Sequence, residues 1–476
     1  MHVATSPAFK ENAHQAIGNV GLQKALARSG PSFIARRAAA AAGLPEFEDL
    51  RNTARDIKNH AIANLDFYLE EYETNVKAAG GHVHWCPDAN AARAAVLAIC
   101  QRVGARTVTK GKSMIGEEIA INAHLERHGI VPIETDLGEY IIQLRDELPS
   151  HIIAPAFHLN MEDWEEAFRK HHTDLPADRS LAERRDILVE ARTRLRSKFL
   201  AADVGITGAN FLIAETGSSV IVTNEGNGDL TQTLPRVHIV LASIEKCVPT
   251  IEDTTSLLRL LARSATGQDF SVYTTFSTGA RRPGDLDGPD EYHVVLIDNG
   301  RSAMIGTEFQ DMLRCIRCAA CMNHCPVYGA VGGHAYGWVY PGPMGSVLTP
   351  GLLGVDKAGH LPNASTFCGK CESVCPVKIP LPKLMRHWRE REFERHLSPA
   401  AYRTNLGLWA FFARRPALYR LATRVGAKAM GWLGRKTGRL GSLPFASGWT
   451  EGRDLPTPEG DTFFVRYARA QRDGTL

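Results

Sequence analysis

The sequence lacks long hydrophobic runs, a strong net charge and a secretory leader. No apolar stretch reaches the roughly 18–20 residues that a membrane-spanning helix needs. The N-terminal residues, MHVATSPAFKENAHQ, show neither the basic start nor the apolar run of a signal peptide. The formal net charge of +3 is too small to favour nucleic acid as the main partner. These absences together predict a cytoplasmic protein that does not bind nucleic acid.

Cysteine is also scarce, with ten among 476 residues, which argues against a disulfide scaffold. Seven of the ten fall between Cys315 and Cys375, while Cys86, Cys100 and Cys247 are scattered. In a reducing compartment such clustering favours bound metal over disulfides. The sequence has no GxGxxG fingerprint in a strand–helix turn, so we place any hydride chemistry outside this chain.

The length predicts two to four structural units. Residues 1–75 form an N-terminal region with helical spacing, and residues 76–300 alternate short apolar runs with helical stretches. This alternation predicts an α/β domain with a largely parallel sheet. Residues 301–385 hold the seven clustered cysteines, and residues 386–476 form a basic helical extension. The runs expected to be buried strands are HVHWC, TVTK, IVPIET, HIIAPA, FLIAET, SVIVTN, VHIVLA, FSVYTTF and HVVLID.

The first cysteine motif, CIRCAACMNHCP, has the spacing C-x2-C-x2-C-x3-C-P of bacterial ferredoxins. Cys315, Cys318 and Cys321 are spaced to hold three corners of one cubane. In two-cluster ferredoxins the fourth cysteine, here Cys325, ligates the other cluster. The motif therefore predicts a 4Fe-4S site and points to a second one.

The second motif, CGKCESVCP, contains Cys368, Cys371 and Cys375 and matches the last three cysteines of the first. Ser365 stands where the missing first cysteine would be. Exchanging the fourth ligands assigns one 4Fe-4S cluster to Cys315, Cys318, Cys321 and Cys375, and the other to Cys325, Cys368 and Cys371. The fourth ligand of the second cluster stays open among Ser365, a distant cysteine, a partner residue, solvent and substrate.

Zinc and disulfides are the alternatives to iron–sulfur clusters. Zinc sites usually pair two CxxC elements for four ligands in total, which seven cysteines with two C-P endings do not match. Disulfides disagree with the expected compartment. We therefore expect two 4Fe-4S clusters.

Beyond the cysteines, the sequence resembles the iron–sulfur subunits of bacterial lactate-utilisation complexes over nearly its whole length. The segments that carry the resemblance are GKSMIGEEIAINAHLERHGIVPIETDLGEYIIQL, PSHIIAPAFHLN, GITGANFLIAETGSSVIVTNEGN, CPVYGAVGGHAYGWVYPGPMGSVLTP and CPVKIPL. The resemblance implies an α/β LUD domain of the NagB/RpiA/CoA-transferase-like fold, then an α-helical ferredoxin domain. It also implies two 4Fe-4S clusters on the same seven cysteines, partner subunits, and a role in oxidising L-lactate to pyruvate.

Three polar segments are further candidates for a site. Glu215, Asn224 and Glu225 follow apolar runs, where parallel sheets bind ligands, although their neighbouring glycines also suit tight turns. Residues 109–114 (TKGKSM) offer lysines at a helix start for an anion, with helix capping by Ser113 as the simpler alternative. Glu134, Asp136 and Glu139 suggest a metal or acid–base role, or else helix caps. His158, His324, His334 and His360 show no paired ligand spacing.

The segment 385–440 is basic and interleaves arginine with tryptophan, phenylalanine and tyrosine. This pattern suits a partner subunit or the inner face of the membrane.

The favoured function is electron transfer through two clusters, between a donor and an acceptor, in a lactate-oxidising complex. One alternative is that the LUD domain itself acts on a small hydroxy or keto acid. Another is an iron–sulfur redox sensor.

Overall fold

The computed structural model describes residues 4–443, 450 and 453–475. It divides into two compact units, Met1–Glu394 and Arg395–Leu476. None of the helices in the described part of the chain combines the length and apolar character needed to span a bilayer.

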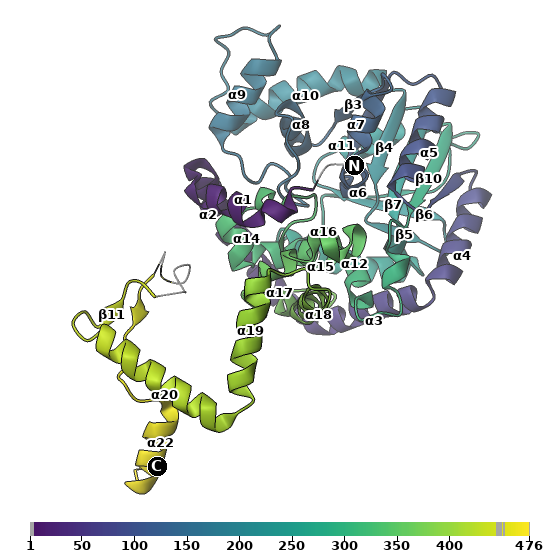
Figure 1. The fold of residues 1–476 in the computed structure, drawn as a ribbon. Helices are drawn as coiled ribbons and strands as arrows, with labels where there is room; N and C mark the ends of the chain where they lie inside the picture. The colour runs from purple at the N-terminus through teal and green to yellow at the C-terminus, as the bar shows by residue number, and fades with distance from the viewer. Residues whose placement is uncertain (1–3, 444–449, 451–452, 476) are drawn as a thin grey trace. The chain divides into compact units, whose positions relative to one another are not determined.

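A six-stranded sheet forms the centre of the first unit (Figure 1). All of its neighbouring strands pair in parallel, which confirms the predicted α/β class with a parallel sheet. Strands buried on both faces explain why their sequences are continuous apolar runs. In spatial order the strands are β1 (His82–Cys86), β10 (Glu291–Ile297), β7 (Val237–Ser243), β4 (Val204–Gly208), β2 (Thr107–Gly111) and β3 (Val131–Glu134).

Helices cover both faces of this sheet. On one face, apolar residues of α5 (Ala89–Arg102), α6 (Met114–Glu118) and α7 (Ile121–Glu126) form a core with Ile206 and Ile239. On the other face, α4 (Leu65–Ala78) packs Leu69 and Tyr72 against Val240 and Val294. At the β3 edge, a third core joins α8 (Leu137–Leu144), α9 (Met161–His171) and α10 (Arg184–Ala201).

A smaller sheet lies beside the main one, in the order β8 (Cys247–Val248), β5 (Phe211–Ile213), β6 (Ser218–Thr223) and β9 (Tyr273–Ser277). Its β5–β6 and β6–β9 pairs are antiparallel.

The strand expected at HIIAPA is wrong, because residues 151–156 form an irregular segment. His151 Nδ1 accepts hydrogen bonds from the backbone N–H groups of Ile153, at 3.3 Å, and Ala154, at 3.2 Å, and so closes a turn. Pro155 also lacks the N–H that a strand would donate.

The cysteine region is built from short helices. The longer ones are α15 (Gly342–Leu353) and α18 (Leu381–Glu394), and the shorter ones are η4 (Gln310–Arg314), α13 (Ala320–Asn323), α14 (Pro326–Val331) and α17 (Lys370–Ser373). This helical structure of the cysteine region confirms the prediction of an α-helical cluster-binding region.

The N-terminal helices pack directly on the cysteine region. They are α1 (Phe9–Gly18), α2 (Val20–Ala42) and α3 (Phe47–Ala63), and one continuous core joins α2, α3, α12 (Ile251–Ala265) and the cysteine region. The four-part division of the chain stays a prediction, and its boundary at 385/386 falls inside α18.

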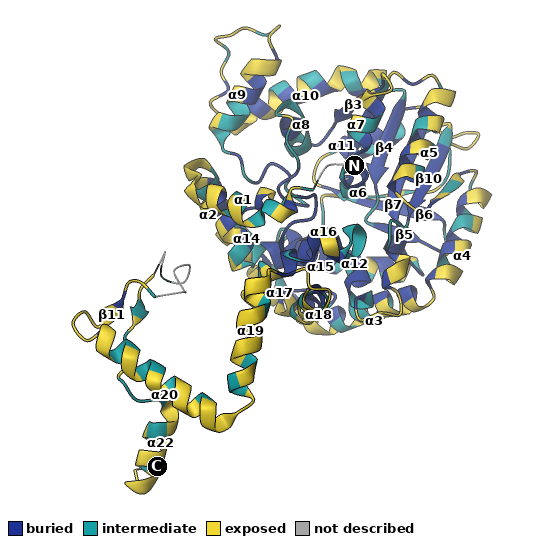
Figure 2. Cartoon of the chain, in the orientation of Figure 1, coloured by how far each residue is buried: buried dark blue, intermediate teal, exposed yellow. Residues whose placement is uncertain are grey.

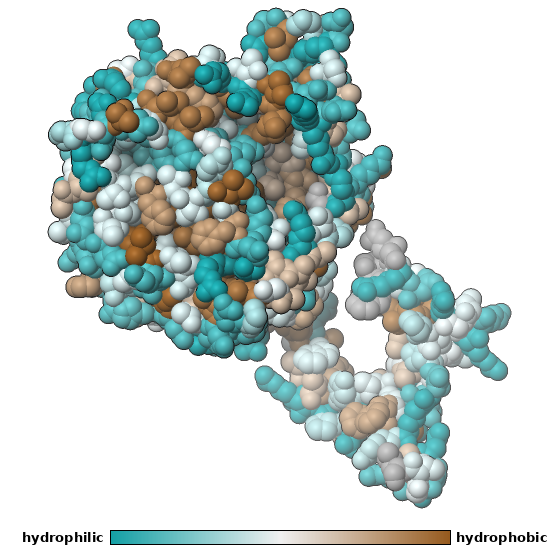
Figure 3. Space-filling view, turned by 180° about the vertical axis from the view of Figure 1, so that it is seen from behind, coloured by the Kyte–Doolittle hydropathy of each residue, from teal (hydrophilic) through white to brown (hydrophobic). Residues whose placement is uncertain are grey.

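The second unit contains α19 (Ala400–Ala413), α20 (Pro416–Leu433) and α22 (Phe463–Arg472), with β11 (Arg439–Leu440) paired to β12 (Leu455–Pro456). None of these three helices buries a described residue (Figure 2). Apolar side chains stand among hydrophilic ones on its surface (Figure 3). The helical extension is thus confirmed for the described residues; residues 444–449, 451–452 and 476 of the predicted region 386–476 lie outside them.

Candidate cluster sites and an adjoining pocket

One cavity brings together four cysteines from the two motifs. Cys315, Cys318 and Cys321 of the first motif line it together with Cys375 of the second. Its remaining wall is apolar and consists of Ile152, Ile316, Ala319, Met344, Pro376, Val377, Ile379 and Leu381. This is the set of four thiols that the exchanged-ligand hypothesis assigns to the first cluster.

A second cavity is lined by Cys325, Cys368 and Cys371, the three cysteines left over. Ser365 and His324 line the same cavity. Cys368 is exposed, in contrast to the buried Cys318, Cys321 and Cys375 of the first cavity. The second site therefore lies nearer to solvent than the first.

The two motifs share a backbone conformation as well as a spacing. In the first, Arg317 and Ala319 flank Cys318 with φ of 59° and 61°. In the second, Phe367 and Gly369 flank Cys368 with φ of 53° and 77°. Left-handed conformations are costly for residues other than glycine, so three such residues mark turns that the surroundings impose. A short helix, α13 or α17, follows each turn.

Backbone N–H groups point at the cysteine sulfurs, as a thiolate-bound cluster requires. The N–H of Arg317 donates to Cys315 Sγ and that of Ile379 to Cys375 Sγ, both at 3.4 Å. The backbone N–H of Lys370 lowers the pKa of the Cys368 thiol. Hydrogen bonds to the sulfurs are one of the means by which proteins set cluster potentials. The residues present therefore fit iron–sulfur clusters.

Burial acts on the thiols in the opposite direction. It raises the pKa of Cys371 to about 12 and that of Cys375 to about 11. It also raises the pKa of Cys321 well above its usual value. Because cluster ligands are thiolates, loading these sites must release protons.

The geometry also bears on the zinc alternative. Among the residues that the structure describes, no three His, Cys, Asp or Glu side chains converge as the ligands of one metal ion do. Zinc needs its four ligands at about 2.0–2.3 Å from a single centre. The two cysteine sets instead line two separate cavities.

The scattered cysteines lie elsewhere. Cys86 and Cys100 belong to the core under α5, and Cys247 to the core under α4, where its thiol donates to Tyr68 O at 3.6 Å. Among the described residues, none of these three cysteines lines the second cavity.

Of the four histidines, only His324 lies at a cysteine cavity, where its Nδ1 donates to Ala320 O at 2.8 Å. His334 and His360 bond to the carbonyl oxygens of Leu148 and Ser6. His158 bonds to Ser150 Oγ at 2.8 Å and Glu147 Oε2 at 2.7 Å.

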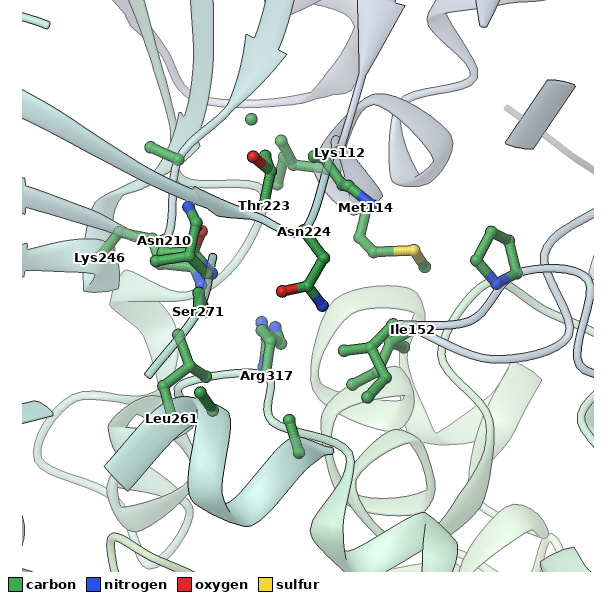
Figure 4. A pocket seen from close by; sticks show the side chains of 18 of the residues that line it. Lys112, Met114, Ile152, Asn210, Thr223, Asn224, Lys246, Leu261, Ser271 and Arg317 are labelled. Carbon is green, nitrogen blue, oxygen red and sulfur yellow. The ribbon is translucent and has the colours of Figure 1, made fainter. Parts of the chain in front are cut away.

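A separate pocket of about 180 Å³ opens at the carboxyl ends of three adjacent parallel strands, where ligands bind in α/β sheets (Figure 4). Lys112 follows β2, Gly208 ends β4 and Ser243 ends β7. Gly208 is needed there, because a Cβ would lie 2.3 Å from the Lys112 carbonyl oxygen. The side chain of Arg317, from the first cysteine motif, forms part of the same wall.

The pocket carries three cationic side chains from different elements. Lys112 forms an ion pair with Asp136 Oδ2. Arg317 donates to Glu245 Oε1 at 3.0 Å. Lys246 is 8% exposed, and within the described residues its Nζ has no hydrogen-bond or ion-pair partner. Burial and the nearby Arg317 lower the pKa of Lys246 to about 7.

The acidic candidates have distinct places. Glu134 pairs with buried Lys110 at 2.8 Å, and Asp136 caps α8 by accepting from the N–H of Gly138. Glu139 lines the pocket, and burial together with nearby carboxylates raises its pKa to about 8. Ser113 caps α6 as expected.

The predicted site at Glu215, Asn224 and Glu225 is only partly correct. Asn224 lines the pocket, but Glu215 accepts from the N–H of Ile251 at 2.6 Å and so serves the start of α12. Glu225 lines a different cavity, beside α10. Lys246 was not predicted from the sequence, where its position between two buried strands was the only signal.

Comparisons with known proteins agree with this architecture. Residues 69–297 match the family model described as LUD domain, and residues 311–379 the 4Fe-4S dicluster domain. A solved DUF162 family protein from Deinococcus radiodurans covers 49% of this chain and 98% of its own, at 13% identity and a TM-score of 0.28. The fold assignment therefore rests on the family models.

Full-length relatives show the family. "Lactate utilization protein B" of Lysinibacillus sphaericus is 42% identical, over 96% of this chain and 95% of its own. The protein of the same name from Bacillus subtilis is 41% identical over the same shares. The "uncharacterized electron transport protein YkgF" of Escherichia coli is 40% identical over 97% of both chains. The chain thus belongs to the lactate utilization protein B family and joins a LUD domain to a 4Fe-4S dicluster domain.

Proposed function

We propose that this chain is the electron-transfer subunit of a complex that oxidises L-lactate to pyruvate, with two 4Fe-4S clusters bound at the two cysteine cavities. The family name of its relatives supports the pathway, and the dicluster family model supports the cofactor type. The observation that carries the proposal is the sorting of seven cysteines into a set of four and a set of three, each lining its own cavity.

The first cluster would be held by Cys315, Cys318, Cys321 and Cys375. When bound, a 4Fe-4S cluster takes up and releases electrons at a potential set by its charge surroundings, hydrogen bonds and exposure. Arginines gather around this set of thiols: Arg51 donates to Cys375 O at 2.7 Å, and burial lowers the pKa of nearby Arg314 without removing its charge. Positive charge beside the cluster favours the reduced state.

The second cluster would be held by Cys325, Cys368 and Cys371. Ser365 and His324 line the same cavity, which supports either of them as the residue that completes its coordination. Because Nδ1 of His324 donates to a carbonyl oxygen, Nε2 keeps a free lone pair.

The unequal burial of the two sites suggests a route for electrons between the interior and the surface. Cys318, Cys321 and Cys375 are buried beside the LUD pocket, whereas Cys368 is exposed. The two cysteine helices α13 and α17 are in contact. Electrons would therefore pass between the interior site and the surface through the second site, where an acceptor or donor protein docks.

The C-terminal unit supports the proposal of partner subunits. Its helices bury none of their described residues, and large apolar side chains such as Trp409, Phe411 and Trp432 are exposed between arginines. We assign this surface to a partner subunit. Binding to anionic lipid vesicles in the absence of partner subunits would assign it to the membrane instead.

The experiment mixes the anaerobically loaded chain with its lactate-utilisation partner subunits and adds L-lactate. Bleaching of the cluster absorbance only when partners are present supports the proposal. Bleaching of the isolated chain by L-lactate would contradict it and favour catalysis by the LUD domain. No bleaching in either mixture would also contradict it.

A further inference from the structure

The LUD pocket lies directly beside the first cysteine cavity. Ile152 lines both spaces, and Arg317 reaches the pocket from a position between Cys315 and Cys318 (Figure 4). Whatever binds in the pocket therefore lies within electrostatic reach of the first cluster site.

A buried network around this junction has more cations than anions. Glu118 pairs with Arg301 at 2.6 Å, and Glu245 pairs with Arg301 and Arg317, both at 3.0 Å. These two carboxylates face three buried cations, which are Lys58, Lys246 and Arg301, together with Arg317, whose side chain is 10% exposed. An uncompensated buried charge is costly, so such a surplus indicates an anionic partner.

Lys246 belongs to this surplus of cations and also lines the pocket. Its charged neighbours are the cations Lys58 and Arg317 and the carboxylate Glu245, which is already paired with Arg301 and Arg317. Lys58 Nζ is bonded to Glu245 O. A buried lysine that lines a cavity without a carboxylate partner is a ready donor for an incoming anion. The thiolates of the adjoining cluster site balance part of the charge from the far side of Arg317 but do not line the pocket.

The remaining walls limit the size and character of the ligand. Met114, Ile152 and Leu261 are apolar parts of the wall, and the amides of Asn210 and Asn224 are polar parts of it. About 180 Å³ is several times the ~30 Å³ that one water occupies in the liquid, yet small for a nucleotide cofactor.

We propose that this pocket binds a small organic carboxylate of the 2-hydroxy or 2-keto acid class, held by Lys246 and Arg317 beside the first cluster. The choice of this acid class rests on the proposed function, whereas binding of a small carboxylate by the cationic pocket does not depend on electron transfer. It adds to that proposal a site on this chain through which substrate or product controls the first cluster.

Calorimetry on the anaerobic full-length chain tests the proposal with L-lactate, pyruvate, lactamide and inorganic phosphate. We expect binding of L-lactate or pyruvate and none of lactamide, which has the shape of lactate without its charge. Lys246→Gln should weaken carboxylate binding by about tenfold or more. Lys24→Gln, the same change at an exposed lysine of α2, should leave it unchanged.

Met114→Trp offers an independent variant. The larger side chain is expected to fill the pocket while Lys246 and Arg317 stay unchanged in sequence. It should abolish carboxylate binding while thermal stability and iron content stay at wild-type values. Wild-type affinity in both Lys246→Gln and Met114→Trp, binding of lactamide as tight as that of lactate, or binding of phosphate alone would each overturn the proposal.

A second readout connects the pocket to the cluster. Saturating carboxylate adds negative charge near Arg317, so it should lower the reduction potential of the first cluster in the wild type and not in Lys246→Gln. Binding in the calorimeter without a change in the reduction potential would refute the coupling between the pocket and the first cluster. It would not refute the binding site itself. A chain that binds carboxylate but holds no iron would refute the proposed function alone.

Discussion

Arg317, which stands between two cysteines of the first motif, donates to Glu245 of the LUD domain over 3.0 Å. Glu245 is 1% exposed and also lies 3.0 Å from Arg301 Nε, at ion-pair distance but without hydrogen-bond geometry. One buried carboxylate thus links the first cysteine motif to the parallel-sheet domain.

Glu245→Gln should be strongly destabilising, because it leaves two buried guanidinium groups short of a counter-charge. Removing one partner of a buried ion pair typically costs about 3–5 kcal/mol. Anaerobic urea unfolding measures the change. Glu308→Gln is the matched control: its pair with Arg391 is partly exposed on both sides, and its loss should cost about 1 kcal/mol or less. Equal costs for the two variants would contradict the account.

The same carboxylate gives a pH dependence with a defined sign. Burial would raise the pKa of Glu245, but Arg301 and Arg317 outweigh it and lower the pKa to about 2. A carboxylate with a depressed folded-state pKa contributes stability that is complete above its unfolded value of about 4.3 and disappears as the pH falls toward the folded value. The stability difference between wild type and Glu245→Gln should therefore be constant from pH 7 to 5 and shrink below about 4.3. A difference that grows on acidification would contradict the pairing.

The grouping of the cysteines around two cavities was predictable from the sequence, because cysteine spacing directly reflects which thiols share a turn. The C-P alignment of the two motifs was enough to predict that Cys375 lines the first cavity and Cys325 the second. The parallel sheet was predictable for a similar reason, since strands buried on both faces are continuous apolar runs. Residues 151–156 are an exception. They are apolar because they form a buried turn, and the periodicity of apolar residues cannot distinguish such a turn from a buried strand.

The pocket was less accessible to sequence reasoning because its wall comes from segments far apart in the chain. Glu215 and Asn224 both follow strands of the small sheet, yet one caps a helix and the other faces the pocket. Arg317 and Lys246 meet only through tertiary packing, and neither follows a pattern that marks an anion site.

Crossed ligation predicts which cysteine substitutions are redundant. Cys318→Ser and Cys375→Ser each remove a ligand of the first cluster, so the double variant should retain about four irons, like either single variant. Cys318→Ser combined with Cys371→Ser removes a ligand from each cluster and should retain almost none. Iron and acid-labile sulfide assays on the anaerobically purified variants measure how much of each cluster is retained. Loss of all iron in the Cys318/Cys375 double variant would show that each motif holds its own cluster.

Ser365→Cys should complete the second motif, because Ser365 lines the second cavity at the position of the missing cysteine. A fourth thiolate should slow the loss of the second cluster in air. The decay of its absorbance under oxygen measures this, with Ser302→Cys, a change in an exposed serine away from the cavities, as the control. An unchanged decay would indicate that His324 or a partner residue already completes the site.

The most direct test of the central claim is iron and acid-labile sulfide per chain after anaerobic purification, with an EPR spectrum of the reduced protein. Two clusters predict about eight irons and eight sulfides per chain, with a signal from two interacting 4Fe-4S centres. Zinc in place of iron, without sulfide, would contradict the electron-transfer account.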